Sequence, residues 1–374
     1  NLYVKYNKLA KEDQSLMDEA RHWFDELEKE NPEAVELWQW FKEISLNEFQ
    51  RVYKLLGVDF DSFNGEAFHS QFMPDVIKEL DEKNLLVDSE GAVIVNLEKY
   101  DLPPVIIKKS NGSSTYMTRD IATAIYRHKT YDFNKNIYVV ATQQLLHFKQ
   151  LKAVLQEMGY EWYDDCVHVP FGMISMKDGA MRTREGKVVF LEDVLNKAID
   201  KTKEIIEQRN PNLENKDEVA RSVGVGAIIF QDLFNNRIKD YVFDWDQVLN
   251  FEGETGPYVQ YSYARSCAIL NKGEFDLNKK ADLSLLKETE EIDLVKLLYR
   301  FPSVIEDAAD RFEPSYITRY VVELAKLFNR FYNACPIHSS SDDIKQARLL
   351  LTYSVNKVLG IGLSLLGIDA PEKM

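Results

Sequence analysis

The sequence predicts an α/β domain that holds half of a doubly wound parallel sheet, followed by an all-α helical bundle. Two observations lead to this fold class. The run 137–141 is uninterruptedly apolar, as expected for a parallel strand covered on both faces, and strand and helix patterns alternate around it. From about residue 190 onward, helical periodicity dominates to the end. A chain of 374 residues has room for two or three such domains.

The first segment, residues 10–56, has the three- and four-residue apolar spacing of helices. Asn31 and Pro32 predict the start of a second helix there, because Asn is a favoured N-cap and Pro fits the first helical position. The apolar stripe of this second helix is broad enough to predict burial on more than one side. Its members are Val35, Leu37, Trp38, Trp40 and Phe41.

Residues 58–110 predict short strands, at 92–97 and 105–108, with one helix near 74–83. Pro103 and Pro104 exclude a helix between the two strands. A strand, helix, strand, helix succession then follows, with a strand at 115–117 and helix 119–129, then strand 136–141 and helix 145–158. This succession is half of a Rossmann-like sheet, in which ligands bind beyond the carboxyl ends of the strands.

The remaining chain predicts helices joined by short loops, with one extended piece at 241–244. The expected helices cover 191–208, 217–236, 257–272, 284–298, 301–309, 314–333 and 341–365. We place the domain boundary near 245–255. Domain 1–245 is then the α/β part, with an insertion at about 10–110 and a connecting helical region from about 190, and domain 246–374 is the helical bundle.

The composition argues against several classes of protein and kinds of site. The net charge of −15 argues against binding nucleic acid by bulk electrostatics, although a local basic face can still bind RNA. No apolar run reaches the roughly 20 residues of a membrane span. The three cysteines form no metal-binding pair, so we expect reduced thiols in the cytoplasm and no metal site. The chain opens at Asn1 without a Met or a secretory leader, and we expect it to be truncated at the front and natural at its end.

A polar cluster is expected at the strand ends of the α/β part. Thr118 can cap the helix that begins after it, which places Asp120 in the first turn, where the helix dipole favours a negative charge. Tyr116 lies just ahead of that helix, and Gln144 and His147 follow the end of the next strand. A carboxylate, a phenol and an amide that converge suit a guanidinium group. The alternative is a capped helix with an ordinary first-turn Asp.

A glycine-flanked loop with four cations, Lys177, Arg182, Arg184 and Lys187, follows the apolar strand near 171–176. Such a loop can bend over phosphates and stabilise a departing pyrophosphate. The sequence has neither a GxGxxG motif nor a P-loop, so nucleotide binding would depend on this loop and on helix termini. The alternative is a solvated hairpin tip.

Residues 253–265 bring three tyrosines, a Gln and an Arg to the start of a helix. Aromatic side chains with polar tips stack on unpaired bases, so this segment suits an RNA loop. The alternative is a set of tyrosines that pack between helices. The run 327–332 has the same two interpretations, with core packing as the default for Phe328 and Phe331.

Taken together, these motifs resemble the arginyl-tRNA synthetases, class I enzymes that join arginine to its tRNA with ATP. The likeness extends along essentially the whole chain, in the family's order. The pieces that carry it are residues 116–122, residues 138–144 with His147, residues 171–173, residues 188–195, residues 256–265 and the terminal Leu-Leu-Gly-Ile…Met. The resemblance implies a partial class I catalytic domain, without the first half of its sheet, and an anticodon-binding helical bundle.

The resemblance also implies a role for individual residues. Arginine binding falls to Tyr116, Asp120 and Gln144, with Asp120 facing the guanidinium. ATP, with its Mg²⁺, is expected at His147, Gly172 and Met173, and the catalytic cations of the signature loop at Lys177, Arg182 and Arg184. The anticodon of tRNA(Arg) is expected at Tyr258, Tyr261, Tyr332 and Met374. No tightly bound cofactor, metal site or membrane contact is implied, and a monomer is expected.

Two departures from the family pattern stand out. None of the six histidines forms the His-x-Gly-His motif, and residues 180–186 read Ala-Met-Arg-Thr-Arg-Glu-Gly where many relatives have Lys-Met-Ser. We therefore expect this chain by itself to be inactive. Two alternatives remain open: a non-catalytic, tRNA-binding paralogue, and a synthetase for another amino acid, such as the cysteinyl enzyme.

Overall fold

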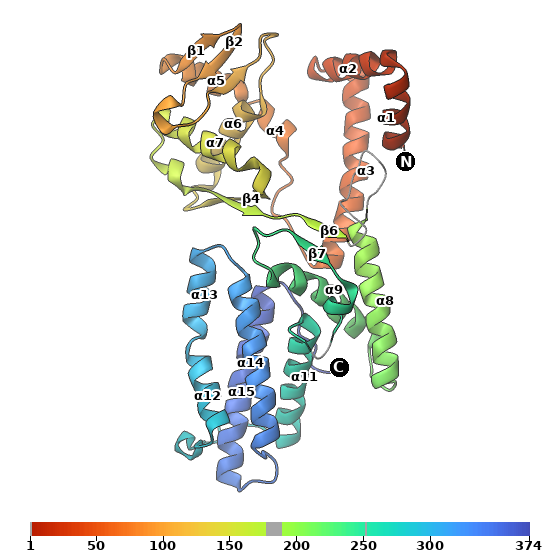
Figure 1. Cartoon of the computed structure of the whole chain (residues 1–374), viewed down its shortest axis with the longest axis vertical. Coiled ribbons are helices and arrows are strands. Elements are labelled where there is room, and N and C mark those ends of the chain that lie inside the picture. Colours follow the sequence, from red (N-terminus) through yellow and green to blue (C-terminus); the bar gives the residue numbers. More distant parts are fainter. Residues whose placement is uncertain (1, 177–188, 251–252) are drawn as a thin grey trace. The chain divides into compact units, whose positions relative to one another are not determined.

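A computed structural model describes residues 2–176, 189–250 and 253–374 (Figure 1). The chain divides into two compact units. The α/β unit comprises residues 60–173 with 238–240, and the helical unit comprises residues 1–59, 174–237 and 241–374.

The α/β unit begins with two helices and a small antiparallel sheet. Helices α4 (Glu66–Ser70) and α5 (Met73–Glu82) precede strands β1 (Leu86–Ser89), β2 (Ala92–Val95) and β3 (Val105–Lys108). The sheet order is β1-β2-β3, and both pairings are antiparallel. The expected helix near 74–83 and the strands around 92–97 and 105–108 are therefore confirmed.

The second half of the α/β unit is a parallel strand pair with two helices. Helix α6 (Tyr116–Tyr131) leads to β4 (Asn136–Ala141), and after the short turn η2 (Thr142–Gln144) comes α7 (Leu145–Glu157). The turn η3 (Glu161–Asp165) precedes β5 (Cys166–Phe171), which pairs with β4 in parallel from Asn136↔Cys166 to Ala141↔Phe171. The predicted strand 136–141 and helix 145–158 are confirmed.

The expectation that β4 is covered on both faces is wrong for the described residues. Tyr138 and Val140 pack against the apolar cluster that α6 and α7 share. Ile137 and Val139, which alternate with them, are 46% and 64% exposed. Successive side chains of a strand point to opposite faces, and within the described α/β unit only one face of β4 carries a packed layer.

The start of α6 also differs from the prediction, which placed a strand at 115–117 and an N-cap at Thr118. The N-cap is Thr115, and the helix begins at Tyr116. Thr118 is buried inside the first turn, where its hydroxyl donates to the carbonyl of Ile107 at 2.8 Å. Asp120 consequently lies in the second turn and not in the first, so the expected contact with the helix dipole is absent.

The helical unit contains most of the helices. Its elements are α1 (Leu2–Glu12), α2 (Gln14–Glu28), α3 (Pro32–Leu56), β6 (Ile174–Met176), α8 (Leu191–Arg209), α9 (Lys216–Phe234), β7 (Tyr241–Phe243), α10 (Trp245–Val248), α11 (Gly256–Gly273), η5 (Leu283–Leu285), α12 (Thr289–Tyr299), α13 (Phe301–Asp310), α14 (Ser315–Ala334) and α15 (Asp342–Leu365). Strands β6 and β7 pair in parallel. The long predicted helices are confirmed, within a few residues at their ends.

The N-terminal helices carry one confirmed and one wrong prediction. Asn31 caps α3, since its side-chain oxygen accepts from the backbone N–H groups of Glu33 and Ala34. The predicted burial of the α3 stripe on more than one side is wrong, because Trp40 and Phe41 are 54% and 56% exposed. Within the described helical unit, α3 contacts α2, and the Arg221 guanidinium donates to the Lys54 carbonyl near the end of α3.

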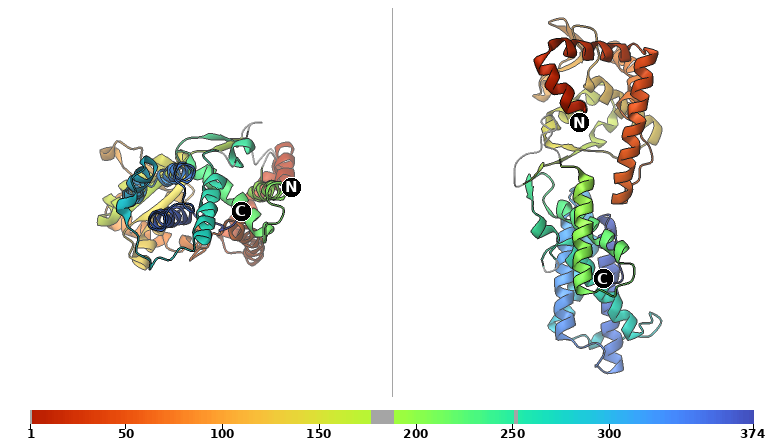
Figure 2. Two further views of the ribbon diagram at one scale, coloured as in Figure 1. Left: turned by 90° about the horizontal axis from the view of Figure 1, so that it is seen from below. Right: turned by 90° about the vertical axis from the view of Figure 1, so that its right-hand side faces the viewer.

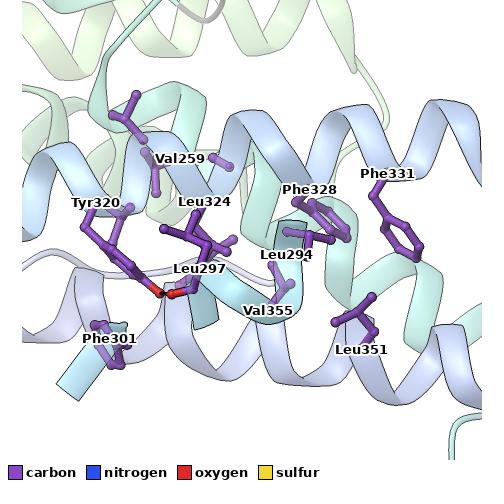
Figure 3. Close-up of a cluster of buried hydrophobic side chains, with 14 of the residues drawn as sticks. Val259, Leu294, Leu297, Phe301, Tyr320, Leu324, Phe328, Phe331, Leu351 and Val355 are labelled. Atoms are coloured by element: carbon purple, nitrogen blue, oxygen red, sulfur yellow. Dashed lines mark hydrogen bonds between the residues drawn. The ribbon is translucent and has the colours of Figure 1, made fainter. Parts of the chain in front are cut away.

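Helices α11 to α15 form a bundle around one apolar core, and Figure 2 shows several of them end-on. Phe328 and Phe331 are completely buried in this core, as their default assignment predicted (Figure 3). The hydroxyl of the buried Tyr320 ring donates to the carbonyl of Leu297 at 2.9 Å, so its polar atom has a hydrogen-bond partner inside the core. In the described residues, no helix is both long and apolar enough to cross a membrane.

Candidate functional site

The polar centre of the α/β unit is a hydrogen bond between Asp120 of α6 and His147 of α7. Nε2 of His147 lies 2.6 Å from Oδ2 of Asp120. The two side chains are partly buried, with 36% of Asp120 and 24% of His147 exposed. A carboxylate that remains accessible at the end of β4 can receive a cationic ligand, because its partner occupies only one of its acceptor positions.

Tyr116 and Gln144 flank this pair. Tyr116 lies one turn before Asp120 on α6 and is 72% exposed. The guanidinium of Arg119 lies 5.5 Å from the centre of the Tyr116 ring, and it is held in turn by Glu66 at 2.5 Å. Gln144 is exposed at the cap position of α7, three residues before His147. The structure thus brings Asp120 and His147 into contact and leaves Tyr116 and Gln144 accessible beside them.

Aromatic rings adjoin the Asp120–His147 pair, since the ring of Phe148 lies 5.5 Å from that of His147. The side-chain amide of Asn136 donates to the Tyr138 hydroxyl at 2.7 Å, and burial raises the pKa of the Tyr138 phenol far above its usual value. The ring of Phe148 lies 5.0 Å from that of Tyr138 and stacks on His168 at 4.3 Å. Tyr138 is consequently uncharged at physiological pH, and it does not neutralise the charge of Asp120.

The predicted ATP-binding backbone at Gly172 and Met173 has a partner in the structure. The Met173 N–H donates to Oδ1 of Asp240 at 2.6 Å. Gly172 is required here, because a Cβ atom would lie 2.5 Å from the backbone carbonyl of Lys239. The Met173 amide is therefore available to a nucleotide only where the ligand displaces Asp240. The expected catalytic cations Lys177, Arg182 and Arg184 lie outside the described residues.

The helical unit brings together three of the residues expected to contact RNA. The guanidinium of Arg265 lies 4.8 Å from the ring centre of Tyr261 and 5.4 Å from that of Tyr332. Both rings are 41% exposed. Asn329 holds the arrangement, since its side-chain oxygen accepts from Arg265 at 2.6 Å and its amide donates to the Tyr258 hydroxyl at 3.0 Å. We call these five residues the tyrosine cluster.

Met374 is not part of the tyrosine cluster. Its side chain packs against a separate apolar group, with Ile206 of α8 and Val219 of α9, and its carbonyl accepts from Asn210 at 3.3 Å. The C-terminal residue is thus tied to the α8–α9 pair. A contact of Met374 with the anticodon stays a prediction.

Sequence reasoning missed two features of these sites. Asn329 was not singled out, although it lies three residues before Tyr332 and therefore on the same side of α14. The expected polar cluster contains both Asp120 and His147, but the sequence does not predict the bond between them, which depends on how α6 packs on α7.

Comparison with known proteins identifies the family. Residues 1–245 match the model of the catalytic domain of the class I tRNA synthetases (R). The chain belongs to the arginyl-tRNA synthetase family. Residues 259–374 match the DALR anticodon binding domain, which follows the catalytic domain in this chain. The family and the fold class predicted from the sequence are confirmed.

Relatives in the arginyl-tRNA synthetase family are longer than this chain. It is 57% identical over 373 residues to the arginine–tRNA ligase of Halothermothrix orenii and 51% identical to that of Clostridioides difficile. The match covers all of this chain and 66% of the length of each relative. The arginyl-tRNA synthetase structure from Plasmodium falciparum superposes with a TM-score of 0.82 at 25% identity, covering 96% of this chain and 62% of that one. The Thermus thermophilus structure has the same fold, with a TM-score of 0.81 at 24% identity over 93% of this chain and 68% of that one.

Proposed function

We propose that this chain carries part of the active site and the anticodon-binding domain of an arginine–tRNA ligase. The observation that carries the proposal is the accessible Asp120 carboxylate, held by His147 at the end of β4 within the family's catalytic domain. A carboxylate matches the charge and the fork geometry of a guanidinium. Tyr116 and Gln144, which are exposed on either side, add a hydroxyl and an amide as polar contacts.

The reaction has two steps. An oxygen of the arginine carboxylate attacks the α-phosphorus of ATP. The bond between the α-phosphorus and the oxygen that bridges it to the β-phosphate breaks, and pyrophosphate leaves with the Mg²⁺ that entered with ATP. A hydroxyl of the terminal tRNA ribose then attacks the carbonyl carbon of arginyl-adenylate, and AMP leaves. No covalent bond to the protein forms, so positioning and electrostatic stabilisation supply the rate.

Named residues contribute to these steps by binding and orientation. Asp120 holds the guanidinium and so fixes the far end of arginine, while the adenosine is bound near His147, Gly172 and Met173. Lys177, Arg182 and Arg184 are the candidates that stabilise charge on the departing pyrophosphate.

The helical unit is proposed to bind tRNA(Arg) through the tyrosine cluster. Two half-exposed rings on either side of a guanidinium offer stacking surfaces and one positive charge, a combination suited to unpaired bases. The whole chain is acidic, so binding relies on this local site. The three free thiols suit a reducing compartment, and we propose a cytoplasmic monomer.

The test is ATP–pyrophosphate exchange with arginine and tRNA(Arg). We would compare this chain with a longer form that has the full length of its relatives, called the extended chain. The extended chain is expected to catalyse exchange only with arginine, and this chain to be inactive. Exchange by this chain alone would contradict the division of the active site. An extended chain that binds tRNA(Arg) without any exchange would favour a non-catalytic paralogue.

A further inference from the structure

We propose that His147 is a positioning residue for arginine, through its hydrogen bond to Asp120, and that it links the arginine subsite to the adenosine subsite. The proposal rests on the function given above. The family resemblance assigns His147 to adenosine alone, whereas the structure places its Nε2 at 2.6 Å from the carboxylate expected to bind the guanidinium.

The geometry defines which ring nitrogen carries the hydrogen. An ionised carboxylate only accepts hydrogen bonds, so Nε2 of His147 must be the donor to Oδ2 of Asp120. In the neutral ring Nδ1 is then an acceptor. The bond fixes the direction of the Asp120 carboxylate and occupies one of its acceptor positions.

This bond prepares the carboxylate for arginine. A free Asp side chain loses rotational freedom when a ligand immobilises it, and a carboxylate held in advance loses less. His147 occupies one lone pair of Oδ2, and a carboxylate has about four acceptor positions. The remaining positions are open to the two N–H groups of a guanidinium fork. Loss of the His147 donor is consequently expected to weaken arginine binding.

The same bond couples the two substrates. Arginine that binds Asp120 restrains the carboxylate and, through it, the imidazole. A restrained imidazole is a better contact for adenosine on the other side. Because coupling between two ligands is reciprocal, arginine should tighten ATP binding by the same factor by which ATP tightens arginine binding.

A purely structural role for the bond is less consistent with the packing. Helices α6 and α7 already share an apolar core, in which Ile121 and Leu151 are completely buried. A partly exposed hydrogen bond adds little to such an interface. Its position at the accessible end of β4, next to Tyr116 and Gln144, is where a substrate would benefit from it.

The experiment uses exchange kinetics of the extended, active chain. His147→Leu removes the donor, His147→Gln keeps one, and Lys149→Ala is the control at an exposed position on the same helix. His147→Leu is expected to raise the KM for arginine roughly tenfold, the effect of losing one hydrogen bond to a charged group. His147→Gln should recover part of this loss, and Lys149→Ala should change neither KM. A His147→Leu protein whose KM rises for ATP but not for arginine overturns the proposal.

A double-mutant cycle tests whether the effect passes through Asp120. In an Asp120→Asn background, His147→Leu should add less than a twofold change in arginine KM; an unchanged tenfold effect overturns the inference. A variant-free test is ¹⁵N NMR of labelled histidine in the wild type, where the hydrogen is expected on Nε2. An Nδ1–H tautomer for His147 also overturns it. Absence of arginine-dependent exchange in the wild-type extended chain would instead refute the proposed function.

Discussion

Replacement of Tyr332 by Ala should weaken tRNA(Arg) binding selectively. The Tyr332 ring is 41% exposed and lies 5.4 Å from the Arg265 guanidinium, so one of its faces is available to a base. Base–aromatic stacking contributes about 1–3 kcal/mol per base. At 1.4 kcal/mol per factor of ten, the dissociation constant for tRNA should rise roughly 5- to 150-fold. Loss of the half-exposed contact to Arg265 should lower the free energy of unfolding by only about 0.5–1 kcal/mol.

The assay is equilibrium binding of labelled tRNA(Arg) at one fixed salt concentration, because phosphate contacts make affinity depend strongly on salt. Tyr332→Phe keeps the ring and should retain most of the affinity. Tyr299→Ala, at a tyrosine of the same unit that is 88% exposed, is the control for loss of a surface aromatic ring. The KM values for arginine and ATP are measured in parallel with the extended chain and should not change.

Two results would refute this reasoning. Equal increases in the KM for tRNA and for arginine, together with a lowered melting temperature, would show that Tyr332 acts through packing. A Tyr332→Phe protein as impaired as Tyr332→Ala would show that the hydroxyl, and not the stacking face, is what the RNA requires.

Four further predictions concern charge and packing. Asp120→Asn in the extended chain should weaken arginine binding by about 1.5–3 kcal/mol, measured by calorimetry, and an unchanged affinity would leave Asp120 without a substrate. Phe328→Ala should lower the free energy of unfolding by about 3–5 kcal/mol in denaturant titrations, because the ring is completely buried, and a loss below 1 kcal/mol would contradict the packing in Figure 3. Arg348→Met should lower the free energy of unfolding by roughly 3–5 kcal/mol, because it leaves the fully buried carboxylate of Glu291 without its partner at 2.7 Å. The double variant Glu291→Gln with Arg348→Met should recover part of this loss. Burial lowers the pKa of the His69 imidazole. Below about pH 6.5 the unfolded chain therefore binds a proton at His69 more readily than the folded chain does, and the free energy of unfolding should fall as the pH drops through that value. His69→Phe should flatten this part of the stability–pH curve, and an unaltered slope would assign it to other groups.

Helix periodicity carried most of the fold prediction, but helix starts needed tertiary information. Asn31 was correctly predicted as a cap, because Pro32 after it leaves one reasonable start for α3. For α6 the predicted cap at Thr118 is wrong, because the helix begins after Thr115, whose side chain makes no capping bond and donates to the Ile106 carbonyl instead. The Thr118 hydroxyl donates to the Ile107 carbonyl of β3, a contact between elements that the sequence does not reveal.

Burial was predicted less well than element type. An apolar stripe shows that a face can be buried, but it does not show what covers it. The aromatic side of α3 at Trp40 and Phe41 and the outer face of β4 at Val139 are exposed in the described residues for this reason. The same limit applies to the site: Asp120 and His147 were both recognised, yet their pairing across 27 positions of sequence required the packing of α6 on α7.

The charged side chains proposed to bind ligands differ in their surroundings from a buried ion pair of the helical bundle. Glu291 and Arg348 are buried and paired with each other, so a ligand could reach either charge only by breaking an ion pair. Asp120 and Arg265, in contrast, are partly accessible and are each held by a polar partner, His147 and Asn329. A single hydrogen-bond partner fixes the direction of a charged group and leaves its other hydrogen-bonding positions open to a ligand. Under the function proposed above, the Asp120 carboxylate is in this way prepared for a guanidinium, and the Arg265 guanidinium for the anionic and aromatic surface of an RNA loop.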